Sequence, residues 1–414
     1  MEKLRFYLTF LLLCAIVSLA NAQPAPNQPK ISAQVDSIVK EIAEINYFLM
    51  GNSADGADGN KAFTQFSNYR ALKYTATKQE LLLLLNHPNG VVRCNAFRAL
   101  CFEDSADLFS IIIDHLHDTA YILEKAPWNY HKTVGDIFIE LATQKHYADY
   151  GWPSKVLDTA QIALLDSILI VSDDVLLYSR EEAINRTAPR DVFYEKIRAF
   201  VQQYELENYE TDAIATLAKY RKEQDIEIIL NALLKEPTSH IYNAISNFPH
   251  PKFFSIVEKN YKNDLSKQAY EDHHLNGIFK ALAAYKNKNA ADLLSISLNK
   301  DETSSDKRKR NAGYLFYALR MHKHAVYDEL FWKLWEDEGL LSLDVFEYLS
   351  DKDPLKAYRL TKRDIFKSNK KFESGKDQNL IRLRNEALAI ASRQIDLIYK
   401  YNKKFGLEII KYNL

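Results

Sequence analysis

The sequence contains little cysteine, glycine and proline. Of its 414 residues, three are Cys, 11 are Gly and 11 are Pro. Cys14 lies in an apolar run at the N-terminus, so only Cys94 and Cys101 remain beyond it. Two cysteines exclude a scaffold held together by many disulfides. The scarcity of helix-breaking residues, beside abundant Leu, Ile, Ala, Lys and Glu, favours helices over strands.

The chain also lacks a large net charge and a second long apolar run. Its formal net charge is −1, but the charge is unevenly spread. Residues 355–414 carry 15 Lys and Arg against 6 Asp and Glu, a local net charge of +9. Beyond the N-terminus no run approaches the ~18 apolar residues of a membrane-spanning helix, so we expect no integral membrane association.

The N-terminus has the three parts of a secretory signal peptide. Lys3 and Arg5 precede an apolar run from Phe6 to Leu19, and Ala20-Asn21-Ala22 follows. We expect cleavage of residues 1–22 after Ala22 and a secreted or periplasmic protein. A retained membrane anchor is the weaker interpretation because the run is short. Lipidation at Cys14 is also disfavoured, because the small residues of a lipoprotein signal do not precede it.

Residues 23–63 are predicted to form a flexible leader with one helix. The segment Ile31–Met50 has apolar residues at a helical period, and Gly51–Asn60 is rich in Gly, Asp, Asn and Ser. A calcium-binding loop is an alternative for the second segment. Asp55 and Asp58 lack the alternating ligand positions and the terminal Glu of such a loop, so a flexible loop is favoured.

Residues 77–118 contain the most regular pattern in the chain. Thr77-x-x-Glu80 is a capping box that predicts a helix start, and Pro88 and Gly90 predict a turn. Gly90 is expected to serve the sharp turn itself. Two helices follow, with small or apolar residues at 92, 96, 99 and 100 and then at 108, 109, 112, 113 and 116. Asp104 or Ser105 is predicted to cap the second helix.

Over about residues 86–118, this order resembles the HEAT repeat, a pair of antiparallel helices that stacks on copies of itself. The residues that carry the resemblance are Pro88, Val92, Arg93, Ala96, Leu100 and Asp118. The resemblance implies an all-α fold, a right-handed α-solenoid of HEAT-like helical hairpins (an armadillo-like α-α superhelix). It implies that Arg93 is structural and bonds to neighbouring turns. It also implies recognition of a protein or peptide partner along a curved helical surface.

Similar cores recur along the chain. Ala-Leu-like pairs occur at Ala99-Leu100, Thr216-Leu217, Ala244-Ile245, Ala281-Leu282 and Ala318-Leu319. From Leu217 onward the intervals are 28, 37 and 37 residues, which suits repeats of two helices. We therefore predict one solenoid over residues 64–414. Residues 380–401 are expected to form a charged capping helix within a basic C-terminal cap.

Two segments, near 124–133 and 147–155, do not fit the repeat and are predicted to be loop insertions. The first holds Trp128 and Tyr130, and the second holds Tyr150 and Trp152. Loops carry function more often than packed helices, and Trp and Tyr suit the centres of protein interfaces. These four residues are the candidate binding residues. The alternative is that their rings only pack over the ends of the repeats.

No pattern of catalytic or metal-binding residues is found in the sequence. The histidines of His115-x-His117 and His322-x-His324 would point to different sides of a helix, so they cannot share a metal. The clusters of Asp and Glu have no second carboxylate that the sequence pairs with them for acid–base catalysis. No phosphate-binding loop and no motif of a catalytic nucleophile is present. The basic run at 307–310 is offset by nearby acids, and export disfavours nucleic-acid binding. We predict neither a cofactor nor a metal nor a nucleic-acid partner.

These observations favour an exported, non-enzymatic binding scaffold. One alternative is an enzyme on an all-α toroid that acts on polysaccharide, which would need carboxylates converging in a closed ring. Another is an envelope component that binds an anionic polymer through the basic residues 355–414. Carboxylates in a deep pocket would favour the enzyme, and a dominant basic patch would favour the polymer-binding component.

Overall fold

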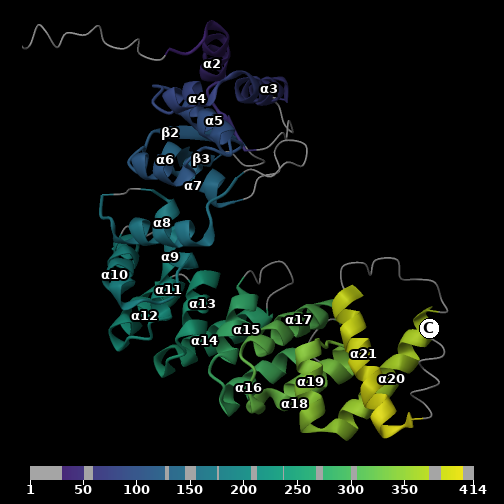
Figure 1. Ribbon diagram of the computed structural model, residues 1–414. Helices are drawn as coiled ribbons and strands as arrows, with labels where there is room; N and C mark the ends of the chain where they lie inside the picture. The colour runs from purple at the N-terminus through teal and green to yellow at the C-terminus, as the bar shows by residue number, and fades with distance from the viewer. Residues whose placement is uncertain are drawn as a thin grey trace, which may run out of the picture. The chain divides into compact units, whose positions relative to one another are not determined.

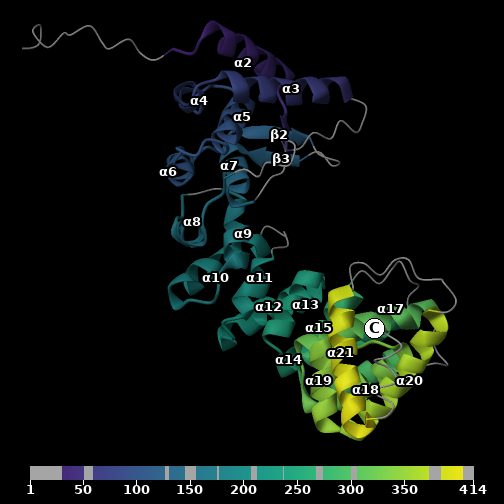
Figure 2. The ribbon, with the colours of Figure 1, turned by 45° about the vertical axis from the view of Figure 1, so that its right-hand side comes forward.

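Figures 1 and 2 show the computed structural model of the protein. It describes residues 30–50, 59–125, 130–144, 155–174, 177–206, 212–235, 237–266, 274–299, 305–372 and 384–403. About 75% of the described residues are helical, which confirms the all-α expectation. The chain divides into two compact units, one ending at Thr187 and one beginning at Ala188. The sequence analysis predicted one continuous solenoid across this boundary.

The first unit contains eight described helices and a small sheet. The helices are α2 (Ala33–Ile45), α3 (Gly59–Thr75), α4 (Lys78–Leu84), α5 (Gly90–Leu100), α6 (Leu108–Asp114), α7 (Val134–Thr143), α8 (Thr159–Val171) and α9 (Ser179–Arg186). The strands are β1 (Phe48–Leu49), β2 (Tyr121–Lys125) and β3 (Tyr130–Thr133). Helix α5 packs against α2, α3, α4 and α7 and lies at the centre of the unit.

Helix α2 is part of this core, which corrects the prediction that it belongs to a flexible leader. Its apolar face, Val35, Val39 and Ile42, is buried against α3 and α5. The backbone N–H of Ser32 donates to a carboxylate oxygen of Glu80 at 2.8 Å. Burial of three apolar side chains contributes several kcal/mol, about 1.5–3 kcal/mol each. The helix was predicted, but within Ile31–Met50 it ends at Ile45, and Phe48–Leu49 form strand β1 instead. The helical period does not reveal what the helix packs against.

The sheet was not predicted at all. Strand β1 pairs with β2 in parallel, and β2 pairs with β3 in an antiparallel arrangement. The segment expected to be a loop insertion near 124–133 therefore begins and ends in strands. Strand β2 alternates, with Tyr121 exposed, Ile122 buried and Glu124 buried. Five residues, one of them a buried glutamate, are too few for the strand period to stand out from the helical pattern.

Of the helix caps predicted for the repeat, the one at α4 is confirmed and the one at α6 is wrong. Thr77 and Glu80 form the predicted capping box at the start of α4. Asn89 caps α5 by accepting from the N–H groups of Val91 and Val92. Helix α6 is capped by Asp107, not by Asp104 or Ser105, since its first turn begins at Leu108. The loop between α5 and α6 is longer than the sequence pattern indicated, so the cap lies two or three residues later than predicted.

The second unit contains twelve described helices. They are α10 (Asp191–Leu206), α11 (Ala213–Ala218), α12 (Ile226–Lys235), α13 (Ser239–Asn247), α14 (Pro251–Ser266), α15 (Leu275–Ala283), α16 (Lys288–Ser295), α17 (Ser305–Met321), α18 (Asp328–Lys333), α19 (Leu343–Lys352), α20 (Pro354–Phe372) and α21 (Arg384–Tyr401). Helices α11, α13, α15 and α17 each contact the next in that order. They form one row, which runs from teal to green in Figure 1.

The predicted Ala-Leu-like pairs form the buried side of this row. All eight of their residues in the second unit are at most 1% exposed: Thr216, Leu217, Ala244, Ile245, Ala281, Leu282, Ala318 and Leu319. Small residues at these positions let neighbouring helices approach closely. The phenol of Tyr220 donates to the carbonyl of Arg190 at 3.0 Å, and that of Tyr285 donates to the carbonyl of His250 at 2.9 Å. Each of these bonds closes one helical hairpin, α10–α11 or α14–α15.

Candidate functional site at the β2–β3 hairpin

Of the four predicted binding residues, the structure describes only the backbone of Tyr130. Trp128, Tyr150 and Trp152 lie outside the described residues. Tyr130 begins β3, where its backbone pairs with that of Glu124, and its side chain is also outside the described part. The structure therefore places β2, which ends at Lys125, and β3, which begins at Tyr130, and the binding role of all four residues stays a prediction.

The hairpin is anchored to the helical core from both strands. Strand β1 pairs Phe48 with Glu124 and Leu49 with Lys125. The ammonium of Lys132, on β3, lies 2.8 Å from a carboxylate oxygen of Glu124 and 2.6 Å from one of Glu140 on α7. Burial alone would lower the pKa of Lys132, but these two carboxylates outweigh it and raise that pKa above its usual value. Lys132 therefore stays charged and ties the hairpin to α7.

A pocket of about 210 Å³ lies between the hairpin and helices α7 and α9. It is lined by His131, Lys132, Asp136, Glu140, Tyr178, Ser179 and Glu182. The buried carboxylate of Asp136 accepts from the hydroxyl of Thr133 at 2.6 Å and from both the N–H and the hydroxyl of Ser179 at 2.8 Å. These bonds fix the pocket wall.

The pocket, which we call the hairpin pocket, has an excess of negative charge. Three carboxylates, those of Asp136, Glu140 and Glu182, face one ammonium, that of Lys132. The side chain of Tyr178 on its rim is 58% exposed. Carboxylates beside an aromatic ring suit the ammonium or guanidinium group of a basic side chain.

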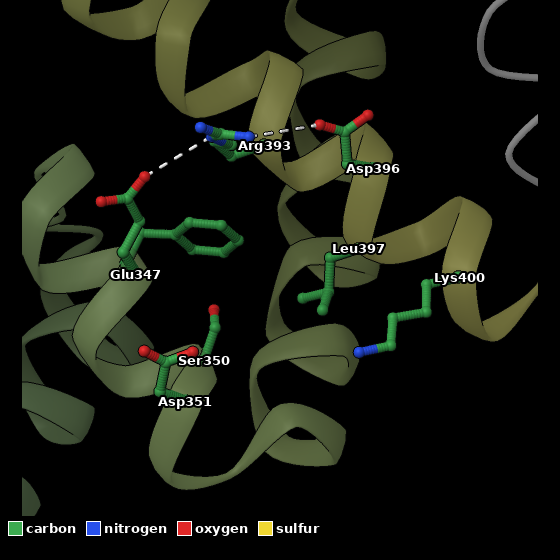
Figure 3. A pocket seen from close by; sticks show the side chains of 8 residues that line it. Glu347, Ser350, Asp351, Arg393, Asp396, Leu397 and Lys400 are labelled. Atoms are coloured by element: carbon green, nitrogen blue, oxygen red, sulfur yellow. Dashed lines mark ion pairs between the residues drawn. The ribbon is translucent and has the colours of Figure 1, made fainter.

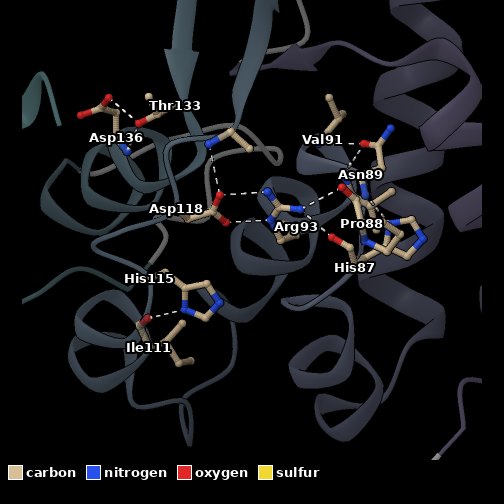
Figure 4. A network of polar contacts seen from close by, with 12 residues as sticks. His87, Pro88, Asn89, Val91, Arg93, Ile111, His115, Asp118, Thr133 and Asp136 are labelled. Atoms are coloured by element: carbon tan, nitrogen blue, oxygen red, sulfur yellow. Dashed lines mark hydrogen bonds and ion pairs between the residues drawn. The ribbon is translucent and has the colours of Figure 1, made fainter. Parts of the chain in front are cut away.

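The residues of the repeat signature position the hairpin rather than form a binding surface. Figure 4 shows the Arg93 guanidinium bonded to both carboxylate oxygens of Asp118, at 2.7 and 2.9 Å. The same side chain donates to the carbonyls of His87 at 2.6 Å and Pro88 at 3.1 Å. The carbonyl of Asp118 accepts from the N–H of Gly135 at the start of α7. Arg93 thus connects the α4–α5 turn to the segment that leads into the hairpin.

The other signature residues are buried within the first unit. Val92, Ala96 and Leu100 are completely buried on α5. Gly90 has a different role from the one predicted, because its φ is not in the left-handed region. A Cβ at this position would lie 2.9 Å from a methyl group of Ile122 on β2. The glycine is required for close packing against the hairpin rather than for a sharp turn.

Arg98 is a structural residue that the sequence analysis missed. Its side chain is 2% exposed and donates to the carbonyls of Leu49 at 2.6 Å and Met50 at 3.0 Å. Its guanidinium also lies 4.0 Å from the ring centre of Tyr69. Arg98 therefore holds the end of β1. The charge of Arg98 alone suggests a residue exposed to solvent. The one feature of the sequence that indicated its burial was its position between the small residues Ala96 and Ala99.

The two cysteines, Cys94 and Cys101, are free and buried. Burial raises the pKa of the Cys101 thiol to about 12, and it raises that of Cys94 well above its usual value. Neither group is a thiolate at neutral pH, so neither is suited to nucleophilic chemistry. Cys101 follows the last residue of α5 and caps that helix.

One serine–histidine pair occurs in the second unit. The Ser246 hydroxyl and Nε2 of His322 lie 2.8 Å apart. Burial, helped by the charge of Lys286, lowers the pKa of His322 to about 4. Within the described residues no carboxylate bonds to His322, so the orienting third group of a catalytic triad is not shown. Also within these residues, no group of three His, Cys, Asp or Glu side chains is arranged to hold a metal.

The basic C-terminal segment is partly neutralised by acids of its own unit. The ammonium of Lys356 lies 3.7 Å from Glu336, and the guanidinium of Arg363 lies 2.8 Å from Asp364. Arg393 pairs with Glu347 at 3.5 Å. These pairs reduce the field that residues 355–414 were expected to present to an anionic polymer.

Comparisons with known proteins add no relative. No protein-family model, curated protein or solved structure matches this chain. Over the residues that the structure describes, no helix combines the length and apolar character needed to cross a membrane.

Proposed function

We propose that the chain is an exported, non-enzymatic binding scaffold built from HEAT-like helical repeats. The row α11, α13, α15 and α17 supports a right-handed α-solenoid, because its buried pairs recur at similar intervals along the sequence. The matching Tyr220 and Tyr285 bonds support the same repeat. Helices that stack in this way expose long surfaces suited to a protein or peptide partner.

The observation that carries the binding role is the anchored hairpin beside an acidic pocket. The pairing with β1 and the ion pairs of Lys132 hold strands β2 and β3 against the helical core. A rigid aromatic element loses little entropy when it binds, which is typical of interface centres. Tyr121 and Tyr178 are exposed at 70% and 58% in the same unit.

The partner that fits this pocket is a protein or peptide segment with a Lys or Arg side chain. Such a side chain would meet the carboxylates of Glu140 and Glu182 and the ring of Tyr178. Lys132 would repel it, but the three carboxylates of the pocket would attract it more strongly. The neighbouring aromatic residues would supply apolar contact. Capture should therefore weaken as salt is raised.

The test is capture of partner proteins from an envelope fraction by the exported protein, quantified by mass spectrometry. We expect Tyr121→Ala with Tyr178→Ala to weaken capture by more than tenfold, because an anchor residue contributes ~2 kcal/mol or more. The melting temperature should stay nearly unchanged, since both side chains are exposed. Tyr74→Ala, which removes a tyrosine 67% exposed on α3, is the matched control and should capture normally.

The predicted residues Trp128 and Trp152 are tested by the same two measurements. If their rings bind the partner, replacing both by Ala weakens capture by more than tenfold and leaves the melting temperature unchanged. If they only pack on the repeats, the melting temperature falls and binding is lost with the fold. Full capture by stable variants of both kinds would contradict the hairpin as the binding site and would favour residues 355–414.

A further inference from the structure

The second unit contains a groove between α19 and α21 that the binding scaffold does not use. It has a volume of about 420 Å³, which is within the usual range of small-ligand pockets. Its lining residues are Phe346, Glu347, Ser350, Asp351, Arg393, Asp396, Leu397 and Lys400. Figure 3 shows the α19 side chains on one wall and the α21 side chains on the other.

One end of the groove is closed by ion pairs. Arg393 lies 3.5 Å from Glu347 across the groove and 3.9 Å from Asp396 on its own helix. Figure 3 shows these three side chains forming a bridge between the walls. Their charges are therefore largely satisfied within the protein, and they define the end of the groove rather than a free binding group.

The other end has three polar groups without such partners. The Ser350 hydroxyl is buried and has no hydrogen-bond partner in the described part of the chain. Within the same residues, Asp351 and Lys400 make no hydrogen bond or ion pair. A buried hydroxyl without a partner is uncommon, because its desolvation costs about 1–3 kcal/mol. A bound polar group would offset this cost.

These groups differ in charge and come from opposite walls. Ser350 and Asp351 lie on α19, and Lys400 lies on α21 (Figure 3). A ligand that satisfies both walls needs an ammonium for Asp351 and a carboxylate for Lys400. A free amino acid carries both groups on one carbon, whereas a dipeptide carries them at its two ends. The buried Phe346 ring and Leu397 provide an apolar surface for its side chains.

We propose that the α19–α21 groove binds a short zwitterionic peptide, a dipeptide with apolar side chains. Its amino terminus pairs with Asp351 and Ser350, and its carboxylate pairs with Lys400. Binding leaves the Glu347–Arg393–Asp396 bridge intact. This site is separate in residues and in ligand from the hairpin pocket, so either proposal can fail without the other.

The test is isothermal titration calorimetry of the exported protein with leucyl-leucine. We expect saturable binding of one peptide per chain. N-acetyl-leucyl-leucine, which lacks the amine, and leucyl-leucine amide, which lacks the carboxylate, should each bind at least tenfold more weakly. Asp351→Asn and Lys400→Gln should each weaken leucyl-leucine at least tenfold. Ser350→Ala should weaken it about fivefold.

Matched controls separate this site from general charge effects. Glu329→Gln and Lys403→Gln remove exposed charges of the same unit outside the groove, and we expect both to bind leucyl-leucine like the unchanged protein. Circular dichroism melting checks that every variant is folded. The proposal is overturned by the absence of saturable binding. It is also overturned by equal binding of the acetylated peptide, which would indicate a simple anion site, or by full affinity in Asp351→Asn and Lys400→Gln.

Discussion

Arg98 is buried on α5 and Arg93 is half-buried there, yet only Arg93 belongs to the repeat pattern. Arg93 bonds to Asp118 and to two carbonyls of the preceding turn. Arg98 bonds to the carbonyls of Leu49 and Met50, which are far away in the sequence. A family pattern predicts a bond that recurs in every repeat. It cannot predict a bond to a segment that lies outside the repeat.

The Arg93–Asp118 pair should be a large contribution to the stability of the first unit. Its side chains are 11% and 16% exposed, and the pairing is bidentate. We expect Arg93→Ala to lower the free energy of unfolding by about 3 kcal/mol, because Asp118 is left without its partner. Urea denaturation followed by circular dichroism measures the change.

The control for this prediction is an exposed ion pair in the same unit. Lys40, which is 75% exposed, pairs with Asp36 one helical turn away. Lys40→Ala should change the free energy of unfolding by only about 0.5 kcal/mol. Equal effects of the two substitutions would show that the Arg93 network does not hold the unit together.

At the scale of secondary-structure elements, Glu80 joins the starts of two helices. It completes the capping box of α4 with Thr77, and it also accepts from the N–H of Ser32, the capping residue of α2. Backbone hydrogen bonds from Ser32 and Thr77, and then the Thr77 hydroxyl, lower the pKa of Glu80 to about 2. One carboxylate therefore stabilises the docking of the predicted leader helix.

This lowered pKa predicts a loss of stability in acid. A carboxyl whose pKa is lower in the folded protein contributes its stability above the unfolded value of 4.5, and that contribution is lost as pH falls towards 2. Glu80→Gln should be less stable than the unchanged protein at pH 6 and should differ from it less near pH 2. Urea denaturation across this pH range tests it, with Glu44→Gln on the exposed side of α2 as the control. A constant difference at every pH would contradict the assignment.

Helix prediction succeeded where strand prediction failed, for a physical reason. A helix repeats its own hydrogen bonds, so ten or more residues share one local period. The strands β1, β2 and β3 have two, five and four residues, and their hydrogen bonds come from distant segments. The pairing of Phe48 with Glu124 depends on where α2 and α5 pack, which no local period specifies.

At the scale of the whole molecule, the proposed export depends on the N-terminus. The tripartite pattern of residues 1–22 predicts cleavage after Ala22. We expect N-terminal sequencing of the exported protein to begin at Gln23, because Ala20 and Ala22 are the small residues that the cleavage site needs. An exported protein that retains Met1 would contradict this prediction and would favour the anchor.

The sequence by itself determined the helical class, the helix start at Thr77 and the buried pairs of α11, α13, α15 and α17. These features follow from local hydrogen bonding and from the period of apolar residues. The tertiary structure decided the sheet, the role of Gly90, the burial of Arg98 and the division at Thr187. It also assembled the hairpin pocket from β3, α7 and α9 and the groove from α19 and α21. Each of these depends on residues tens of positions apart, and a sequence pattern does not record which faces meet.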